Sequence, residues 1–130
     1  MSAGDYEVRW IGRQAAVAMP AEIDVANADE IHRALVSAAS LGAPVLIVDM
    51  SGTTFCDSAG VHAIIAAYKQ AAAVDTQLRL VAPAVMRILT LVGVDQLVPL
   101  YPTLQAALAG APSAQTNMRD LGDEPGETTP

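Results

Sequence analysis

The sequence predicts an α/β domain with a mixed sheet of four or five strands and about four helices that lie mostly on one face. Strand-like and helix-like segments alternate along residues 6–109 in the order β-β-α-β-α-β-α-β-α. Such alternation is typical of βαβ crossovers and a largely parallel sheet. The first two segments follow each other directly as a hairpin, which makes the sheet mixed and places one strand at its edge.

The amino-terminal part is expected to form this hairpin and then the first helix. Tyr6–Trp10 and Ala15–Met19 have strand character, and residues 11–14 are expected to join them. Asn27 precedes Glu30 by three residues, which resembles a capping box at a helix start. One helical face then carries the apolar residues Ile31, Leu35 and Ala38.

A central strand and a second helix follow. Gly42 and Pro44 end the first helix, and the β-branched run Val45–Val48 is typical of a strand that is covered on both faces. The polar residues 51–54 are expected to form a loop that leads into the second helix. Its apolar residues recur at the spacing of one helical face: Val61, Ile64, Ile65, Tyr68 and Ala72.

The remaining segments predict a strand, a helix, a strand and a short helix. Leu78–Ala82 is the expected strand, Pro83 suits the first turn of the next helix, and Gly93 ends that helix. The apolar face of this third helix comprises Val85, Ile88, Leu89 and Val92. Leu97–Tyr101 and Thr103–Ala109 are the expected last strand and last helix.

Length and composition indicate one folded domain of 130 residues and 13.5 kDa, with 52% hydrophobic and 16% charged residues. Seven Lys+Arg against fourteen Asp+Glu give a net charge of −7, which argues against nucleic acid or an anionic membrane as partner. No apolar stretch reaches the roughly 18 residues of a membrane-spanning helix. We therefore expect a soluble, cytoplasmic protein.

The composition changes after Gly110. Residues 111–130 are rich in Pro, Gly, Thr, Asp and Glu, and Met118 and Leu121 are their only large apolar residues. Such a segment buries too little surface to offset its ordering entropy. The sequence thus predicts a domain over residues 1–110 and an acidic, disordered tail over residues 111–130.

The residues that stand out lie between the central strand and the second helix, at Phe55–Gly60. Asp57 or Ser58 is expected to cap this helix. Gly60 in the first turn weakens a helix by roughly 0.5–1 kcal/mol relative to Ala, so we expect another backbone to approach closely there. The single cysteine, Cys56, is expected to be a small buried hydrophobe rather than a redox switch.

No catalytic site is predicted. Cys56–Gly60 resembles the Gly-x-Ser-x-Gly turn of hydrolases with its first Gly replaced. A hydrolase also needs a usable histidine, but the chain has only His32 and His62, and His62 follows Ser58 by four residues on the same helix. Glycine-rich phosphate-binding motifs and metal-ligand spacings are absent from the sequence, so we expect no metal and no cofactor.

Three stretches resemble a known family. Residues 22–27 are similar to a Gly-Glu-Leu-Asp segment, although Ala21 replaces its glycine. Residues 48–60 resemble a hydrophobic strand followed by Asp-Ser-Ser-Gly, with Ala59 in place of the second serine, and residues 80–93 match the strand and amphipathic helix that follow. Together these stretches resemble the STAS-domain anti-sigma factor antagonists of bacteria, also called anti-anti-sigma factors.

The resemblance implies a STAS fold and a regulatory function without enzymatic activity. The unphosphorylated protein would bind an anti-sigma factor that is itself a serine kinase, and would thereby release a sigma factor. The kinase would phosphorylate Ser58 to switch the antagonist off, and a serine phosphatase would reset it. We expect a monomer or weak dimer. The expected partner-binding surface comprises Asp24, Asp57, Ala59, Gly60, His62 and Ala63.

A second hypothesis comes from a different functional class. The chain would then be a STAS module that senses a nucleotide or another small ligand, or a component of a stressosome-like scaffold, without control of a sigma factor.

Overall fold

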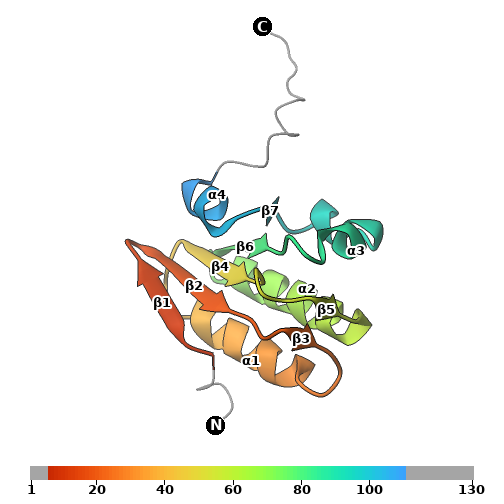
Figure 1. Ribbon diagram of the computed structural model, residues 1–130. Coiled ribbons are helices and arrows are strands. Elements are labelled where there is room, and N and C mark those ends of the chain that lie inside the picture. Colours follow the sequence, from red (N-terminus) through yellow and green to blue (C-terminus); the bar gives the residue numbers. More distant parts are fainter. Residues whose placement is uncertain (1–5, 111–130) are drawn as a thin grey trace, which may run out of the picture.

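A five-stranded mixed sheet forms the centre of the molecule, in the computed structural model, which describes residues 6–110. The strand order is β1-β2-β4-β6-β7, and only β1 is antiparallel to its neighbour. These strands are β1 Val8–Ile11, β2 Gln14–Ala18, β4 Val45–Asp49, β6 Gln77–Val81 and β7 Leu100–Tyr101 (Figure 1). The predicted mixed α/β sheet is confirmed, whereas the predicted tail lies outside the described residues.

The opening hairpin has a tighter turn than the sequence suggested. Ile11 and Gln14, which we placed in the connecting loop, pair with each other as the last residues of the two strands. The turn therefore consists of Gly12 and Arg13 alone. Gly12 has φ +63°, as the first turn residue of a tight hairpin requires.

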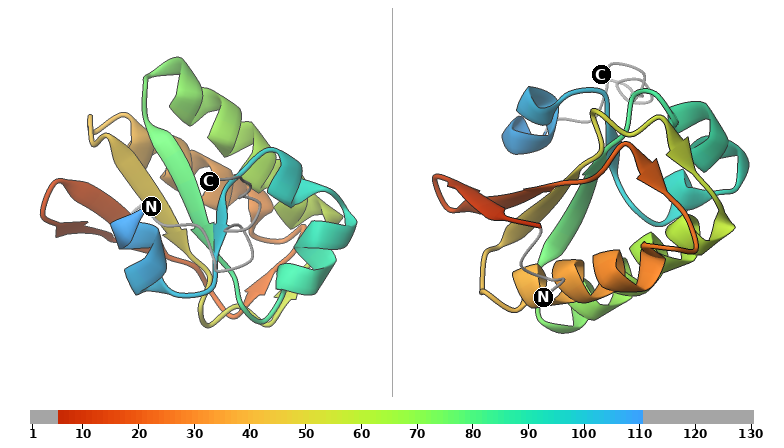
Figure 2. Two further views of the ribbon diagram at one scale, coloured as in Figure 1. Left: turned by 90° about the horizontal axis from the view of Figure 1, so that it is seen from above. Right: turned by 60° about the horizontal axis from the view of Figure 1, so that its bottom comes forward.

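Two long helices cover one face of the sheet. α1 (Ala28–Ala39) and α2 (Ser58–Ala73) lie side by side on this face (Figure 2). The inward side chains of the strands pack against them in the main core. Alternate strand residues point to the opposite face. There the short helix α4 (Leu104–Ala109) covers a smaller cluster that includes Ile47, Val81 and Tyr101.

Side chains from the sheet hold α4 on this second face. The Nε2 of Gln14 donates to the carbonyl of Leu108 at 2.9 Å, and the Nη1 of Arg79 donates to the carbonyl of Ala107 at 2.7 Å. Both carbonyls belong to the last turn of α4, where intrahelical donors run out. The carbonyl of Ala107 also accepts from the amide of the C-cap residue Gly110 at 3.2 Å, whereas no backbone donor within residues 6–110 reaches that of Leu108. The sheet thus supplies the hydrogen bonds that the end of the helix needs.

The third helix is shorter than predicted. α3 spans Met86–Leu91, so Pro83 lies in the turn before it rather than in its first turn. Only one side of so short a helix reaches the core: Leu89 is buried, whereas Ile88 and Val92 are exposed, contrary to our expectation. Of the apolar face predicted for α2, Ala72 is also exposed, and Ala71 is buried in its place.

The chain after α3 also differs from the expectation. Gly93 has φ +85° and turns the chain into a short 3₁₀ helix, Val94–Gln96, which the sequence analysis did not predict. This irregular segment contributes two buried side chains to the main core, Val94 and Val98. As a result, the predicted strand Leu97–Tyr101 is reduced to β7 at its last two residues.

A second, two-stranded sheet lies beside the start of α2. β3 (Glu22–Ile23) and β5 (Phe55–Cys56) run parallel, with Glu22 opposite Phe55 and Ile23 opposite Cys56. The predicted capping box before α1 is wrong, because the side chain of Asn27 caps no helix N–H. Its oxygen accepts from the amide of Asp24 and its nitrogen donates to the carbonyl of Glu22, so it braces the end of β3 instead.

Candidate functional site

Asp57 fixes the point at which α2 begins. It is the N-cap residue, and its Oδ1 accepts a hydrogen bond from the amide of Gly60 at 3.0 Å. Its own amide donates to the carbonyl of Ile23 at 3.1 Å, which extends the β3–β5 pairing to the helix start. Of the two capping residues that the sequence suggested, the structure uses Asp57, and Ser58 becomes the first residue of the helix.

Ser58 is exposed at this helix start. Within residues 6–110 its hydroxyl has no hydrogen-bond partner, and the amides of Ser58 and Ala59 have no acceptor. Unpaired amides and the helix dipole favour negative charge at this end of a helix. A phosphate on the Ser58 oxygen would therefore lie in a favourable electrostatic environment.

Gly60 is buried because other parts of the fold occupy the space beside it. A Cβ at this position would lie 2.6 Å from the Cγ2 of Ile23 and 2.7 Å from the Sγ of Cys56. The expected close approach is real, but side chains of β3 and β5 make it rather than another backbone. Gly60 thus lets the first turn of α2 pack directly on the small sheet.

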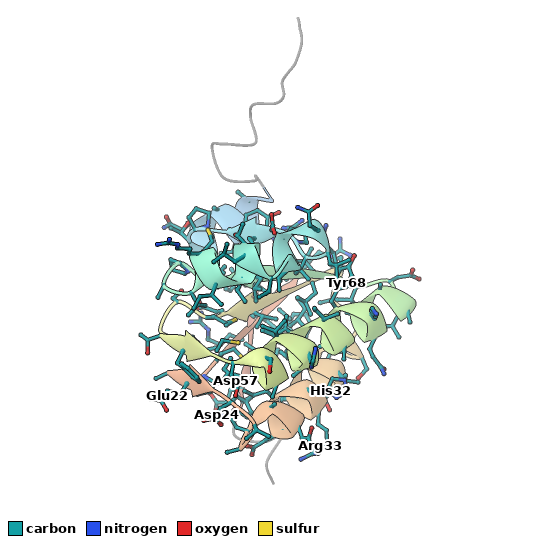
Figure 3. All side chains as sticks on the ribbon, turned by 90° about the vertical axis from the view of Figure 1, so that its right-hand side faces the viewer. Glu22, Asp24, His32, Arg33, Asp57 and Tyr68 are labelled. Carbon is teal, nitrogen blue, oxygen red and sulfur yellow. The ribbon has the colours of Figure 1, made fainter. Side chains whose placement is uncertain are left out.

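Asp24 lies in the loop that leads from β3 to α1 and is half-buried. Its Oδ1 accepts from the amide of Ala26 at 2.9 Å, and its carbonyl accepts from the amide of Ala28 at 2.9 Å. Asp24 and Asp57 lie at the same end of the molecule, as Figure 3 shows. The pairing of β3 with β5 brings together these two acidic residues, which are far apart in the sequence.

The remaining predicted partner-binding residues lie along α2. His62 is exposed, Ala59 is half-buried, and Ala63 is buried, with 8% of its surface exposed. All three line a shallow groove of about 380 Å³ whose other wall comes from α1 and the loop before it. Ala63 lies mostly inside the molecule, so it offers little of the open surface that we expected from it.

A second groove lies on the other side of α2, against α3. It has a volume of about 340 Å³, and the start of α2 and the exposed face of α3 form its walls. The lining residues are Cys56, Asp57, Ser58, Val61, His62, Ile65, Ile88 and Val92. The sequence analysis missed this surface because it placed Ile88 and Val92 in the core; the short spacing between Pro83 and Gly93 was the available signal.

Cys56 is buried beneath this groove. Burial raises the pKa of its thiol from 9.0 to about 11, and the carboxylate of Asp57 adds to the shift. Since the thiolate is the reactive form of cysteine, the thiol is protonated and unreactive near neutral pH. The expectation that Cys56 is buried is therefore confirmed.

The described residues contain no group of three or more His, Cys, Asp or Glu side chains that could hold a metal ion. Over the same part of the chain, every helix is too short or too polar to cross a membrane.

The fold and the site together define a small α/β module with an exposed serine at the start of a long helix. The family model of the STAS domain matches residues 6–107. The chain therefore belongs to the STAS-domain family. A search of curated proteins found no relative of this sequence.

Solved structures with the same fold include regulators and a transporter. An anti-sigma factor antagonist from Mycobacterium paratuberculosis is 28% identical, with a TM-score of 0.70 over 82% of this chain and 92% of that chain. The antagonist SpoIIAA in its unphosphorylated form is 18% identical, with a TM-score of 0.63 over 91% and 99%. SpoIIAA from Bacillus has also been solved in its phosphorylated form.

The murine anion transporter Slc26a9 also contains this fold. It is 21% identical, with a TM-score of 0.63 over 78% of this chain, but the match spans only 18% of the transporter. The fold therefore occurs both in small regulators and as one part of a much larger protein.

The packing of Gly60 leads to a stability prediction. Gly60→Ala should lower the free energy of unfolding by about 1–2 kcal/mol, because overpacking costs about 1–3 kcal/mol and the gain in helix propensity returns only part of it. Gly52→Ala is the matched control, since a Cβ there meets no atom within 4 Å. Urea unfolding of both variants checks the prediction, which fails if the two are equally stable.

The raised pKa of Cys56 leads to a pH prediction. Alkylation of the folded protein by iodoacetamide should accelerate about tenfold per pH unit up to about pH 11, because only the thiolate reacts. In urea the rate should level off near the ordinary cysteine pKa of 9.0. Mass spectrometry follows both reactions, and a plateau near this ordinary value in the folded protein would contradict the assignment.

Proposed function

We propose that this protein is an anti-sigma factor antagonist that is switched by phosphorylation of Ser58. The observation that carries the proposal is the exposed, unbonded Ser58 hydroxyl at the start of α2, next to a groove with apolar walls. Membership of the STAS-domain family and the likeness to antagonists, one of them solved in a phosphorylated form, support it.

The proposed modification needs a kinase but no catalytic group from this chain. The Ser58 oxygen attacks the γ-phosphorus of a nucleoside triphosphate that the anti-sigma factor holds. A new P–O bond forms to Ser58, the bond to the nucleoside diphosphate breaks, and the hydroxyl proton passes to a base outside this protein. A serine phosphatase reverses the state by hydrolysis, which returns the hydroxyl and releases inorganic phosphate.

The groove between α2 and α3 is the proposed docking surface for the anti-sigma factor. Its apolar side chains remain accessible in the free protein: Ile88 is 49% and Val92 is 58% exposed. Ser58 and Asp57 line the end of the same groove. A partner that covers the groove also covers the phosphorylation site, so kinase docking and antagonist binding use one surface.

Phosphorylation would act on the complex rather than on the fold. A phosphate adds about −1.5 to −2 charges at neutral pH beside the carboxylate of Asp57. At the exposed helix start this charge is well tolerated, but under a docked partner it would have to lose its water without a fixed cation to replace it. The partner therefore releases the phosphorylated form, while the antagonist stays folded.

The proposed function implies a location in the bacterial cytoplasm, where sigma factors and their regulators meet.

A sensor of a small ligand or a scaffold component is the competing proposal. The fold is not confined to sigma-factor regulators, since it also occurs in an anion transporter. Affinity purification of the chain distinguishes the two: recovery of an anti-sigma factor with kinase activity supports the antagonist, and recovery of only a metabolite or further copies of the chain contradicts it.

Ser58→Ala tests the modification site. Intact-mass measurement after incubation with the anti-sigma factor and ATP should show one phosphate on the wild type and none on the variant. The variant should unfold within about 0.5 kcal/mol of the wild type, because Asp57 rather than Ser58 caps the helix. Phosphate on the Ser58→Ala protein would place the acceptor elsewhere.

Ile88→Lys tests the docking surface. The added charge should weaken binding of the anti-sigma factor at least tenfold, since a desolvated lysine without a partner costs more than about 1.4 kcal/mol. Val74→Lys is the matched control, because Val74 is similarly exposed, at 52%, but lies at the far end of α2. Calorimetric titration measures both, and equal loss of affinity in the two variants would exclude the groove.

A further inference from the structure

His62 lies one helical turn after Ser58 in α2, and both residues line the groove between α2 and α3. Among the described residues that line the groove between α2 and α3, His62 is the only side chain that can become positively charged. It follows Ser58 by one helical turn, a spacing that places Cβ atoms about 5–6 Å apart. Helical side chains lean toward the amino-terminal end, so the imidazole leans toward the first turn of α2.

We propose that His62 pairs with the phosphate on Ser58 and thereby makes the phosphorylated state sensitive to pH. The protonated ring donates a hydrogen bond to a phosphate oxygen within the same helix. The only bond that forms is an N–H bond of the imidazole, which takes up one proton from solvent when the pair forms; no bond of the phosphate changes. This inference rests on the proposed function in one respect, namely that Ser58 is the residue that carries phosphate.

The groups around His62 leave the phosphate as its strongest partner. Asp29 and His32 of α1 line the groove between α1 and α2. Cys56 of β5 and Asp57, the N-cap of α2, line the groove between α2 and α3. The carboxylate of Asp57 already accepts from the Gly60 amide, and the Cys56 thiol is neutral. Asp29 carries one charge at an exposed position, whereas a phosphate carries nearly two.

The consequence for regulation follows from the imidazole chemistry. Only the protonated imidazole pairs with the phosphate, so the pair forms as the pH falls and is lost as the pH rises. When it forms, it holds the phosphate over the first turn of α2, at the end of the proposed docking groove. Because the positive imidazolium stabilises the dianionic phosphate, the pair also lowers the affinity of the phosphate for its second proton.

Phosphorus NMR of the full chain tests this pairing directly. Phosphoserine is introduced at position 58 during translation, so no kinase is needed. The second ionisation of an isolated phosphoserine has its midpoint near about pH 6. In the wild type this midpoint should fall by about half a pH unit or more, a roughly threefold loss of proton affinity, compared with His62→Gln.

Two controls separate the pair from general effects. His32→Gln should titrate like the wild type, because His32 lines only the opposite groove. His62→Lys should keep the lowered midpoint, because it retains a positive charge at the same position. Equal midpoints in the wild type and His62→Gln would overturn the inference. A kinase that fails to modify Ser58 would contradict only the proposed function, since the phosphate here is introduced independently.

Discussion

The close contact of Gly60 with Ile23 and Cys56 is the constraint on which the functional end of the molecule depends. There is no room for a Cβ between the first turn of α2 and the small sheet of β3 and β5. This contact sets where α2 starts, and the bond from the Gly60 amide to Asp57 caps it there. Because Asp57 takes the capping position, the hydroxyl of Ser58 is left free at the surface.

At the start of α2, the residues that stabilise the fold are different from the residues that are accessible to a partner. Gly60 and Cys56 face inward and are used by the core. Ser58 and His62 face outward one turn apart, and α3 provides an apolar wall beside them because it is too short to bury both of its sides. We therefore expect a charge added to Ser58 to change the surface and to leave the packing beneath it unchanged.

Periodicity in the sequence was sufficient to predict the mixed sheet, the edge hairpin and the two long helices, since their apolar residues repeat over several turns or strand positions. β3 and β5 were missed because a two-residue strand has no detectable period. Ile88 and Val92 were placed in the core because one apolar helical face was assumed for the whole segment. The short spacing between Pro83 and Gly93, however, leaves room only for the short helix α3. The glycine signal at Gly60 was read correctly as a close approach, but only the structure identifies its neighbours.

The most direct test of this account compares the affinities of the unmodified and the Ser58-phosphorylated chain for the anti-sigma factor, measured by calorimetry at one pH. The account predicts that the unmodified protein binds and that phosphorylation weakens binding by about a hundredfold or more, as expected for an unpaired charge in a desolvated interface. Equal affinities, with both forms folded, would contradict it.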